Sequence, residues 1–171
     1  MSLLSRLFGK REDPREALRP LWHRVVEISR RPEWYREAGV ADTVAGRFDM
    51  ITAILALVLI RMERDEEDRA PPVLLTELFV EDMDGQLREA GIGDVVVGKH
   101  IGKLMSVLGG RLGAYRDALR AEGDEALAEA AARNLTLADG ADPAAVAAAL
   151  RRFEATLATT DDAALLAGRI D

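Results

Sequence analysis

The two histidines, His23 and His100, are the residues in this chain whose type is best suited to catalysis or to metal binding. Histidine titrates near neutral pH and is the commonest metal ligand. The two stand far apart in the sequence, whereas a metal site needs three or four ligands at a recognisable spacing. We therefore interpret both as structural or solvated. The alternative, a small-molecule enzyme, would require a polar pocket around His100 and Asp94.

The acidic residues Asp82 and Asp84 are the next candidates for chemistry. They stand two apart in a predicted helix, so their side chains point to nearly opposite sides and cannot share one ligand. Asp82 and Gln86 fall on the apolar face of this helix, which is marked by the spacing of Leu75, Phe79, Met83 and Ala90. A carboxylate there must be paired, or covered by something other than the core. Either Asp82 pairs with a neighbouring basic residue while Asp84 is solvated, or Asp82 lines a groove for a partner.

Small residues mark one side of the following helix. They are Gly98, Gly102, Ser106, Gly109 and Gly113. Each interior glycine costs about 1 kcal/mol of helix stability relative to alanine, so close approach of another backbone is expected on this side. In a soluble protein this spacing favours tight packing within the chain over contact with a partner.

Lys99 and Lys103 lie one helical turn apart and share a face with Ser106 and Gly110. One interpretation is a solvated basic stripe, since surface charges usually contribute little to stability. The other is a contact to an acidic partner or to a loop of a membrane protein.

Hydrophobic periodicity predicts the elements that position these residues. It indicates an all-α single bundle of about six to eight helices, with no confident strand. The run from Met50 to Ile60 is apolar on all sides, which is typical of a buried central helix near 44–64. At eleven residues it is too short to span a bilayer, which takes about 20. Helices are also expected at 14–29, 73–90, 95–121, 124–134 and 142–159, with Thr43, Asp124 and Asp142 as N-caps.

The domain organisation follows from the same pattern. Residues 13–160 are expected to form the bundle, and residues 161–171 a short C-terminal helix or tail. Residues 1–12 are expected to be a flexible amphipathic arm that is either a disordered tail or a weak contact to an anionic membrane surface. The arm carries Leu3, Leu4, Arg6, Leu7, Phe8, Lys10 and Arg11.

Composition narrows the function further. The 171 residues carry a net charge of −7 and no cysteine, so disulfide and thiol chemistry are excluded, and a specific nucleic-acid binder is disfavoured. No phosphate-binding loop is present. The sequence indicates no cofactor, no metal ligand and no catalytic residue.

A set of motifs in order resembles the ubiquinol–cytochrome c chaperone family. The motifs are Trp34-Tyr35, Ala38-Gly39-Val40, Asp42-Thr43, Gly46-Arg47-Phe48-Asp49-Met50, Asp82-Met83-Asp84, Leu87-Arg88-Glu89, Gly91, Gly93-Asp94, Val97, Lys99, Gly110-Arg111 and Tyr115. The resemblance covers roughly residues 34 to 120. The chain departs from the family pattern at Gly98, Leu108 and Gly109, which puts the client or the affinity in question and leaves the fold intact.

The resemblance implies a non-enzymatic assembly factor that binds newly made cytochrome b during the biogenesis of respiratory complex III. It also implies a small partner protein and a cytoplasmic location in peripheral contact with the inner membrane. As a hypothesis, the client surface comprises Asp82, Arg88, Asp94, Gly98, Lys99, Gly102, Lys103 and Ser106. The alternative to this function is a helical scaffold or oligomeric interaction protein with another client.

Overall fold

The computed structural model describes residues 13–64, 69–89 and 94–171, except for the side chains of Leu87 and of residues 94–98. Within these ranges the predicted all-α bundle is confirmed, and the one pairing of extended backbone is an isolated bridge between Val40 and Leu137. The elements in chain order are the 3-10 helix η1 (Pro14–Leu18) and the α-helices α2 (Arg19–Ser29), α3 (Pro32–Arg36), α4 (Val44–Met62), α5 (Ala70–Glu89), α6 (Asp94–Arg120), α7 (Glu125–Asn134), α8 (Pro143–Thr159) and α9 (Asp162–Leu166).

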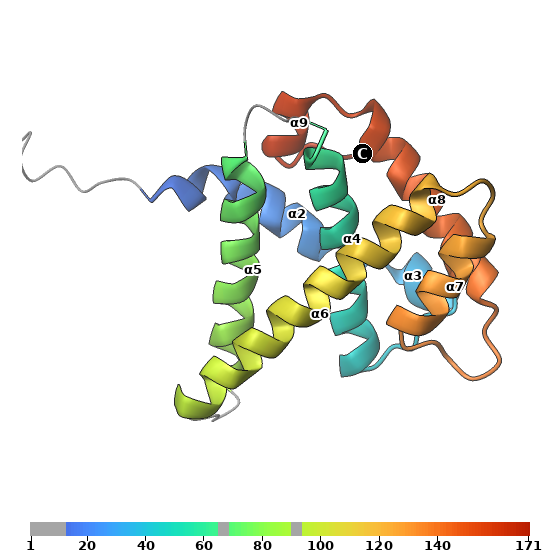
Figure 1. Cartoon of the computed structure of the whole chain (residues 1–171), viewed down its shortest axis with the longest axis horizontal. Helices are drawn as coiled ribbons and strands as arrows, with labels where there is room; N and C mark the ends of the chain where they lie inside the picture. Colours follow the sequence, from blue (N-terminus) through green and yellow to red (C-terminus); the bar gives the residue numbers. More distant parts are fainter. Residues whose placement is uncertain (1–12, 65–68, 90–93) are drawn as a thin grey trace, which may run out of the picture.

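Helix α4 forms the centre of the bundle, and α2, α5, α6 and α8 pack around it (Figure 1). Every residue from Asp49 to Leu59 is buried, as the long apolar run predicted. The hydroxyl of Thr43 caps the helix by accepting the N–H of Gly46 at 3.1 Å. The position of α4 therefore determines where the outer helices sit.

Helices α5 and α6 form a hairpin whose shared end projects beyond the other helices (Figure 1). Helix α5 begins at Ala70, earlier than predicted, because Pro71 and Pro72 fit a first helical turn, where no N–H bond is needed. Helix α6 has 27 residues and is about 40 Å long. No residue from Lys99 to Val107 is buried, while Leu108, Tyr115 and Ala118 are. Residues 99–107 of α6 therefore lie largely at the surface.

Two local predictions were wrong. The single helix expected at 14–29 is divided into η1 and α2, because Pro20 has no N–H to donate and its ring would clash with a carbonyl one turn earlier. Asp124 does not cap α7 with its side chain, since its carboxylate accepts a hydrogen bond from Arg151 Nε at 3.1 Å. The Asp142 cap of α8 is present, with Oδ1 2.9 Å from the Ala144 nitrogen.

The end of the chain packs against α2. Leu165 and Ile170 are buried, and the Ile170 carbonyl accepts a hydrogen bond from Arg24 Nε at 2.9 Å. Gly168 has a φ of +71°, and a Cβ there would lie 2.6 Å from the Pro20 carbonyl oxygen. Glycine is therefore required for this close approach. None of the helices in the described ranges has the length and apolar character needed to cross a membrane.

Candidate partner-binding clefts

A buried polar cluster fixes α6 against α4. Asp49 accepts a hydrogen bond from Arg111 Nη2 at 2.6 Å, and its other oxygen accepts from the backbone N–H and the hydroxyl of Thr136 at 2.8 and 2.7 Å. Arg111 also donates to the Thr52 hydroxyl, and its guanidinium lies 5.7 Å from the centre of the Phe48 ring. The Asp49 and Arg111 side chains are only 10% and 12% exposed, so the pair is well shielded from solvent. This cluster sets the crossing of α6 over α4.

An open apolar depression, which we name the hairpin cleft, lies between α5 and α6 over Leu59 of α4. Its volume is about 930 Å³. Val73 is 56% exposed and Met105 is 41% exposed, although both are large apolar residues. The apolar side chains that the hairpin contributes are those of Pro72, Val73, Val80, Ile101, Met105 and Leu112. The cleft therefore presents to solvent an apolar surface that the protein's own core does not cover.

The rim of the hairpin cleft is more acidic than basic. Its carboxylates are those of Glu63, Glu77, Glu81 and Asp84, and its cations are Arg15 and Arg88. Arg15 pairs with Glu81 at 3.3 Å and Arg88 with Asp84 at 2.8 Å. Glu63 accepts from Arg116, and this hydrogen bond raises the pKa of the Arg116 guanidinium. The carboxylates outnumber the cations among the lining residues, but three of the four are paired with arginines. The rim therefore favours basic groups only weakly, and the apolar floor is the property that favours an apolar occupant.

A second apolar depression, the α4 cleft, lies on the other side of α6. Its volume is about 770 Å³, and it is lined by Val44, Phe48, Ile51, Met83 and Leu104 among others. Val44 is 89% exposed. The large apolar residues exposed in the described part of the chain therefore all line one of the two clefts beside α6.

Asp82 lies in neither apolar cleft. It is half-buried and lines a groove between α2 and α5, together with His23 and Gln86. Gln86, which falls on the apolar face of α5 in the sequence, is exposed in the structure. Asp84 was expected to be solvated, yet it is half-buried, pairs with Arg88, and has an Oδ1 atom without a hydrogen-bond partner among the described residues.

The glycine side of α6 faces outward. A Cβ built at Gly102, Gly109 or Gly113 would meet nothing within 4 Å, and Ser106 is exposed. The expectation of tight packing within the chain is therefore wrong for these residues. Lys99 and Lys103 are also exposed. Together they form one outward face of small and basic residues, opposite Leu108 and Tyr115, which pack inward.

The residues proposed from sequence for the client surface are thus spread over several faces. Asp82 lines the α2–α5 groove, Arg88 lines the hairpin cleft, and Gly102, Lys103 and Ser106 lie with Lys99 on the outer face of α6. The Asp94 and Gly98 positions lie outside the described side chains. So do the arm residues Leu3, Leu4, Arg6, Leu7, Phe8, Lys10 and Arg11, and the loop residues Gly91 and Gly93.

The features that would support an enzyme are weak. His100 is half-buried at the edge of the apolar α4 cleft, and His23 is exposed. The described residues contain no group of three histidine, cysteine or acidic side chains that could hold a metal ion. Burial raises the pKa of the Tyr115 hydroxyl well above its usual range, but this side chain is enclosed in the core rather than in a cleft.

Comparisons with known proteins identify the family. The family described as Ubiquinol-cytochrome C chaperone matches residues 36–171 of this chain. The chain belongs to this family. It is also similar to the crystal structure of the Cbp3 homolog from Brucella abortus, with 31% sequence identity and a TM-score of 0.78 over 99% of this chain and 96% of that chain. No curated protein matches the chain.

The motifs that carried the resemblance to the chaperone family are largely structural. The Trp34 indole donates to the Ile28 carbonyl and the Tyr35 hydroxyl to the Ser29 carbonyl, each at 2.7 Å. A Cβ at Gly46 would lie 2.0 Å from the Ala41 carbonyl oxygen. These contacts fix the approach to α4. Of the three departures from the family pattern, Leu108 is buried, Gly109 faces open space and Gly98 has no described side chain.

The hairpin cleft was not predicted from the sequence, although a signal for it was present. Ile101, Met105, Leu108 and Leu112 recur at helical spacing on α6, and only Leu108 is buried. An apolar stripe normally indicates a core face. That this stripe is mostly uncovered depends on the end of the hairpin projecting past its neighbours, which one sequence does not reveal.

Proposed function

We propose that this chaperone binds newly made cytochrome b during biogenesis of ubiquinol–cytochrome c reductase, without catalysis, and that the hairpin cleft receives the client. The observation that carries the proposal is the exposure of Val73 and Met105 in a cleft of about 930 Å³. Monomeric soluble proteins rarely leave contiguous apolar surface open unless it receives a partner.

The shape of the cleft suits an apolar helix or an extended apolar segment. On α6 the lining runs from Ile101 to Leu112, which is about 17 Å along the helix axis. On α5 it continues along successive turns, from Val73 to Val80. A helix placed between two helices can bury residues at helical spacing on both sides, which is a common mode of peptide recognition. A membrane protein supplies such segments before they are shielded.

The outer face of α6 lies beside the cleft and is proposed to contact polar parts of the same client. Lys99 and Lys103 place two positive charges one turn apart, and the glycines beside them allow another backbone to come close. Arg88 on the rim of the cleft is proposed to contact the client as well, whereas Asp82 lies apart in the α2–α5 groove. A bound client would thus rest its apolar side in the cleft and its polar side along α6.

The test is affinity capture of the tagged protein from detergent-solubilised membranes of its own host, read by mass spectrometry. Wild type is expected to recover cytochrome b without the other subunits of the mature complex. Met105→Glu places a charge in the cleft and should lower recovery about tenfold or more, since about 1.4 kcal/mol of lost binding energy suffices for that change. Lys99→Glu combined with Lys103→Glu should also weaken recovery.

Val44→Glu is the matched control, because it puts the same charge on an exposed apolar residue of the α4 cleft. We expect this variant to recover cytochrome b like wild type. If Val44→Glu abolished capture while Met105→Glu did not, the client would use the α4 cleft. If neither folded variant changed capture, the apolar clefts would not be the client site.

A further inference from the structure

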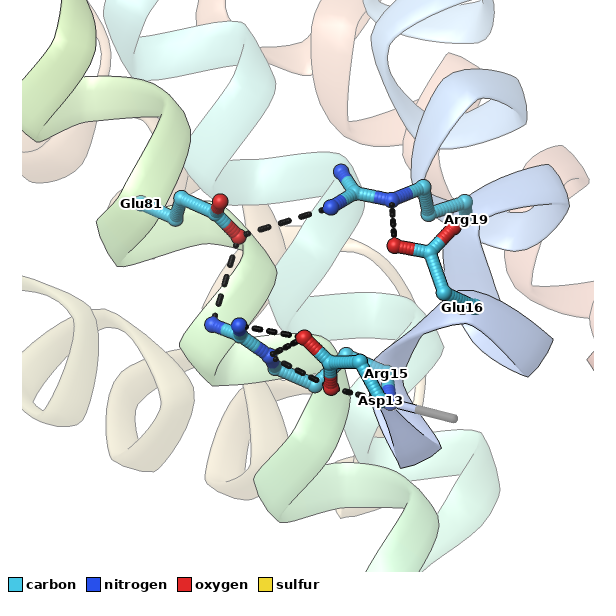
Figure 2. Close-up of polar contacts among 5 residues, drawn as sticks. All are labelled: Asp13, Arg15, Glu16, Arg19 and Glu81. Carbon is cyan, nitrogen blue, oxygen red and sulfur yellow. Dashed lines mark hydrogen bonds and ion pairs between the residues drawn. The ribbon is translucent and has the colours of Figure 1, made fainter. Parts of the chain in front are cut away.

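The described chain begins at the mouth of the hairpin cleft. Figure 2 shows the ion pairs that hold this part of the chain against α5. The guanidinium groups of Arg15 and Arg19 lie 3.3 and 3.8 Å from the Glu81 carboxylate. Asp13 caps η1 through the Arg15 backbone N–H at 3.0 Å, and its carboxylate also accepts from the Arg15 side chain. Arg15 and Glu81 both line the cleft. Whatever precedes Asp13 is therefore tethered beside the cleft.

The residues that precede Asp13 have the chemistry of an occupant for this cleft. Leu3, Leu4, Leu7 and Phe8 stand at the i, i+1, i+4 and i+5 positions that give a helix one apolar stripe. Three basic residues, Arg6, Lys10 and Arg11, and one acidic residue, Glu12, accompany them. The cleft is apolar along its floor, and three of the four carboxylates on its rim are already paired with arginines. The match between the arm and the cleft is therefore chiefly one of apolar surfaces.

The tether is long enough for the apolar residues to enter the cleft. Phe8 stands seven residues before Arg15, so an extended connection spans at most about 25 Å and a helical one about 10 Å. The cleft itself is about 17 Å long on the α6 side, from Ile101 to Leu112. Because a short tether gives an effective concentration on the order of 1 mM, even weak affinity would fill the cleft for much of the time.

We propose that residues 1–12 dock in the hairpin cleft of their own chain. The docking requires no client, so it does not rest on the proposed function. In the free protein the docked arm covers the apolar surface around Met105.

Thiol labelling tests the docking. The chain has no cysteine, so Met105→Cys introduces a single thiol on the cleft wall, at a position that is 41% exposed. The rate of its reaction with a maleimide is compared in the full chain and in the chain lacking residues 2–12. We expect the deletion to raise the rate about threefold or more, which corresponds to a cleft filled for about two thirds of the time. A Val44→Cys thiol in the α4 cleft should react at the same rate in both.

A matched pair of arm variants separates the apolar stripe from general effects of charge. Leu7→Asp combined with Phe8→Asp should raise the Met105→Cys labelling rate as much as the deletion does. Ser2→Asp combined with Ser5→Asp adds the same charge on the opposite side of the stripe and should leave most of the protection in place.

Three outcomes would overturn the proposal. Equal labelling with and without the arm would mean that the cleft is open. Protection that grows with protein concentration would mean that the arm occupies a second copy rather than its own chain. An arm that gives no protection in solution, yet holds the protein on phosphatidylglycerol vesicles, would be a membrane contact. Because no client is present, each outcome can occur whether or not cytochrome b binds the cleft.

Discussion

Asp49 on α4 and Arg111 on α6 lie 2.6 Å apart in the bundle interior, with both side chains nearly enclosed. Arg111 immediately precedes Leu112, which lines the hairpin cleft. The ion pair therefore does more than stabilise the core, since it holds the wall of the cleft at a fixed distance from α4. The remaining Asp49 oxygen is satisfied by Thr136, so the cluster also ties α6 to the connection between α7 and α8.

Breaking this pair should destabilise the protein strongly. Asp49→Ala leaves the Arg111 guanidinium enclosed without its counter-charge and is expected to lower the free energy of unfolding by about 3–5 kcal/mol, measured by urea denaturation. Arg116→Ala is the control on the same helix, because it breaks the more exposed pair with Glu63 and should cost about 1 kcal/mol or less. Similar losses for the two variants would contradict a special role for the buried pair.

Two glycines should respond oppositely to alanine. Gly46→Ala drives a methyl group into the Ala41 carbonyl oxygen, at a distance of 2.0 Å, and should destabilise the fold by about 2 kcal/mol or more. Gly102→Ala meets open space within a helix and should stabilise it by about 0.5–1 kcal/mol. Thermal unfolding of the two variants checks both signs. A destabilised Gly102→Ala would mean that α6 packs against something inside the chain.

Tyr115 offers a test of burial without a hydrogen bond. Its side chain is fully enclosed, and its hydroxyl has no partner among the described residues. Tyr115→Phe should leave the free energy of unfolding unchanged or raise it by up to about 1 kcal/mol, because no hydrogen bond is lost. Trp34→Phe is the contrast, since it removes the indole hydrogen bond to Ile28 and should be destabilising. A clear loss of stability in Tyr115→Phe would reveal a partner for the hydroxyl.

Acid should loosen η1 before it unfolds the bundle. The hydrogen bonds from Arg15 lower the pKa of Asp13 from 3.8 to about 2. Because this native pKa is depressed, the stabilisation is fully present above about pH 4 and is lost as the pH falls towards 2. Amide hydrogen exchange in η1 should accelerate over that interval, and Asp13→Asn should remove this acid dependence. An unchanged acid dependence in Asp13→Asn would assign the transition to another group.

Periodicity predicted the buried faces well where a helix is covered along its whole length. The apolar run in α4 and the stripe of α2 that includes Leu21, Val25 and Ile28 are both in the core. In these helices neighbours surround every turn, so the pattern in the sequence and the burial in the fold agree. Pro20 was overlooked, and this single residue accounts for the division between η1 and α2.

Periodicity did not predict burial correctly where a helix extends beyond the helices that pack against it. On α5, Leu75 and Phe79 are buried, whereas Gln86 on the same face is exposed near the projecting end of the hairpin. The pattern identifies which side of a helix is apolar but not how far the covering helices extend. The Asp49–Arg111 pair was hidden for a related reason, because its residues stand 62 positions apart and one sequence does not show which charges meet.

The most direct test of the client site is photo-crosslinking from the cleft in the native host. A benzophenone amino acid at Met105 should form an adduct with newly made cytochrome b, since Met105 lines the hairpin cleft. The same group at Glu129, which is exposed on α7 and does not line the hairpin cleft, should form none. Adducts from Met105 alone would support the hairpin cleft as the client site. Adducts from Glu129 and none from Met105 would contradict it.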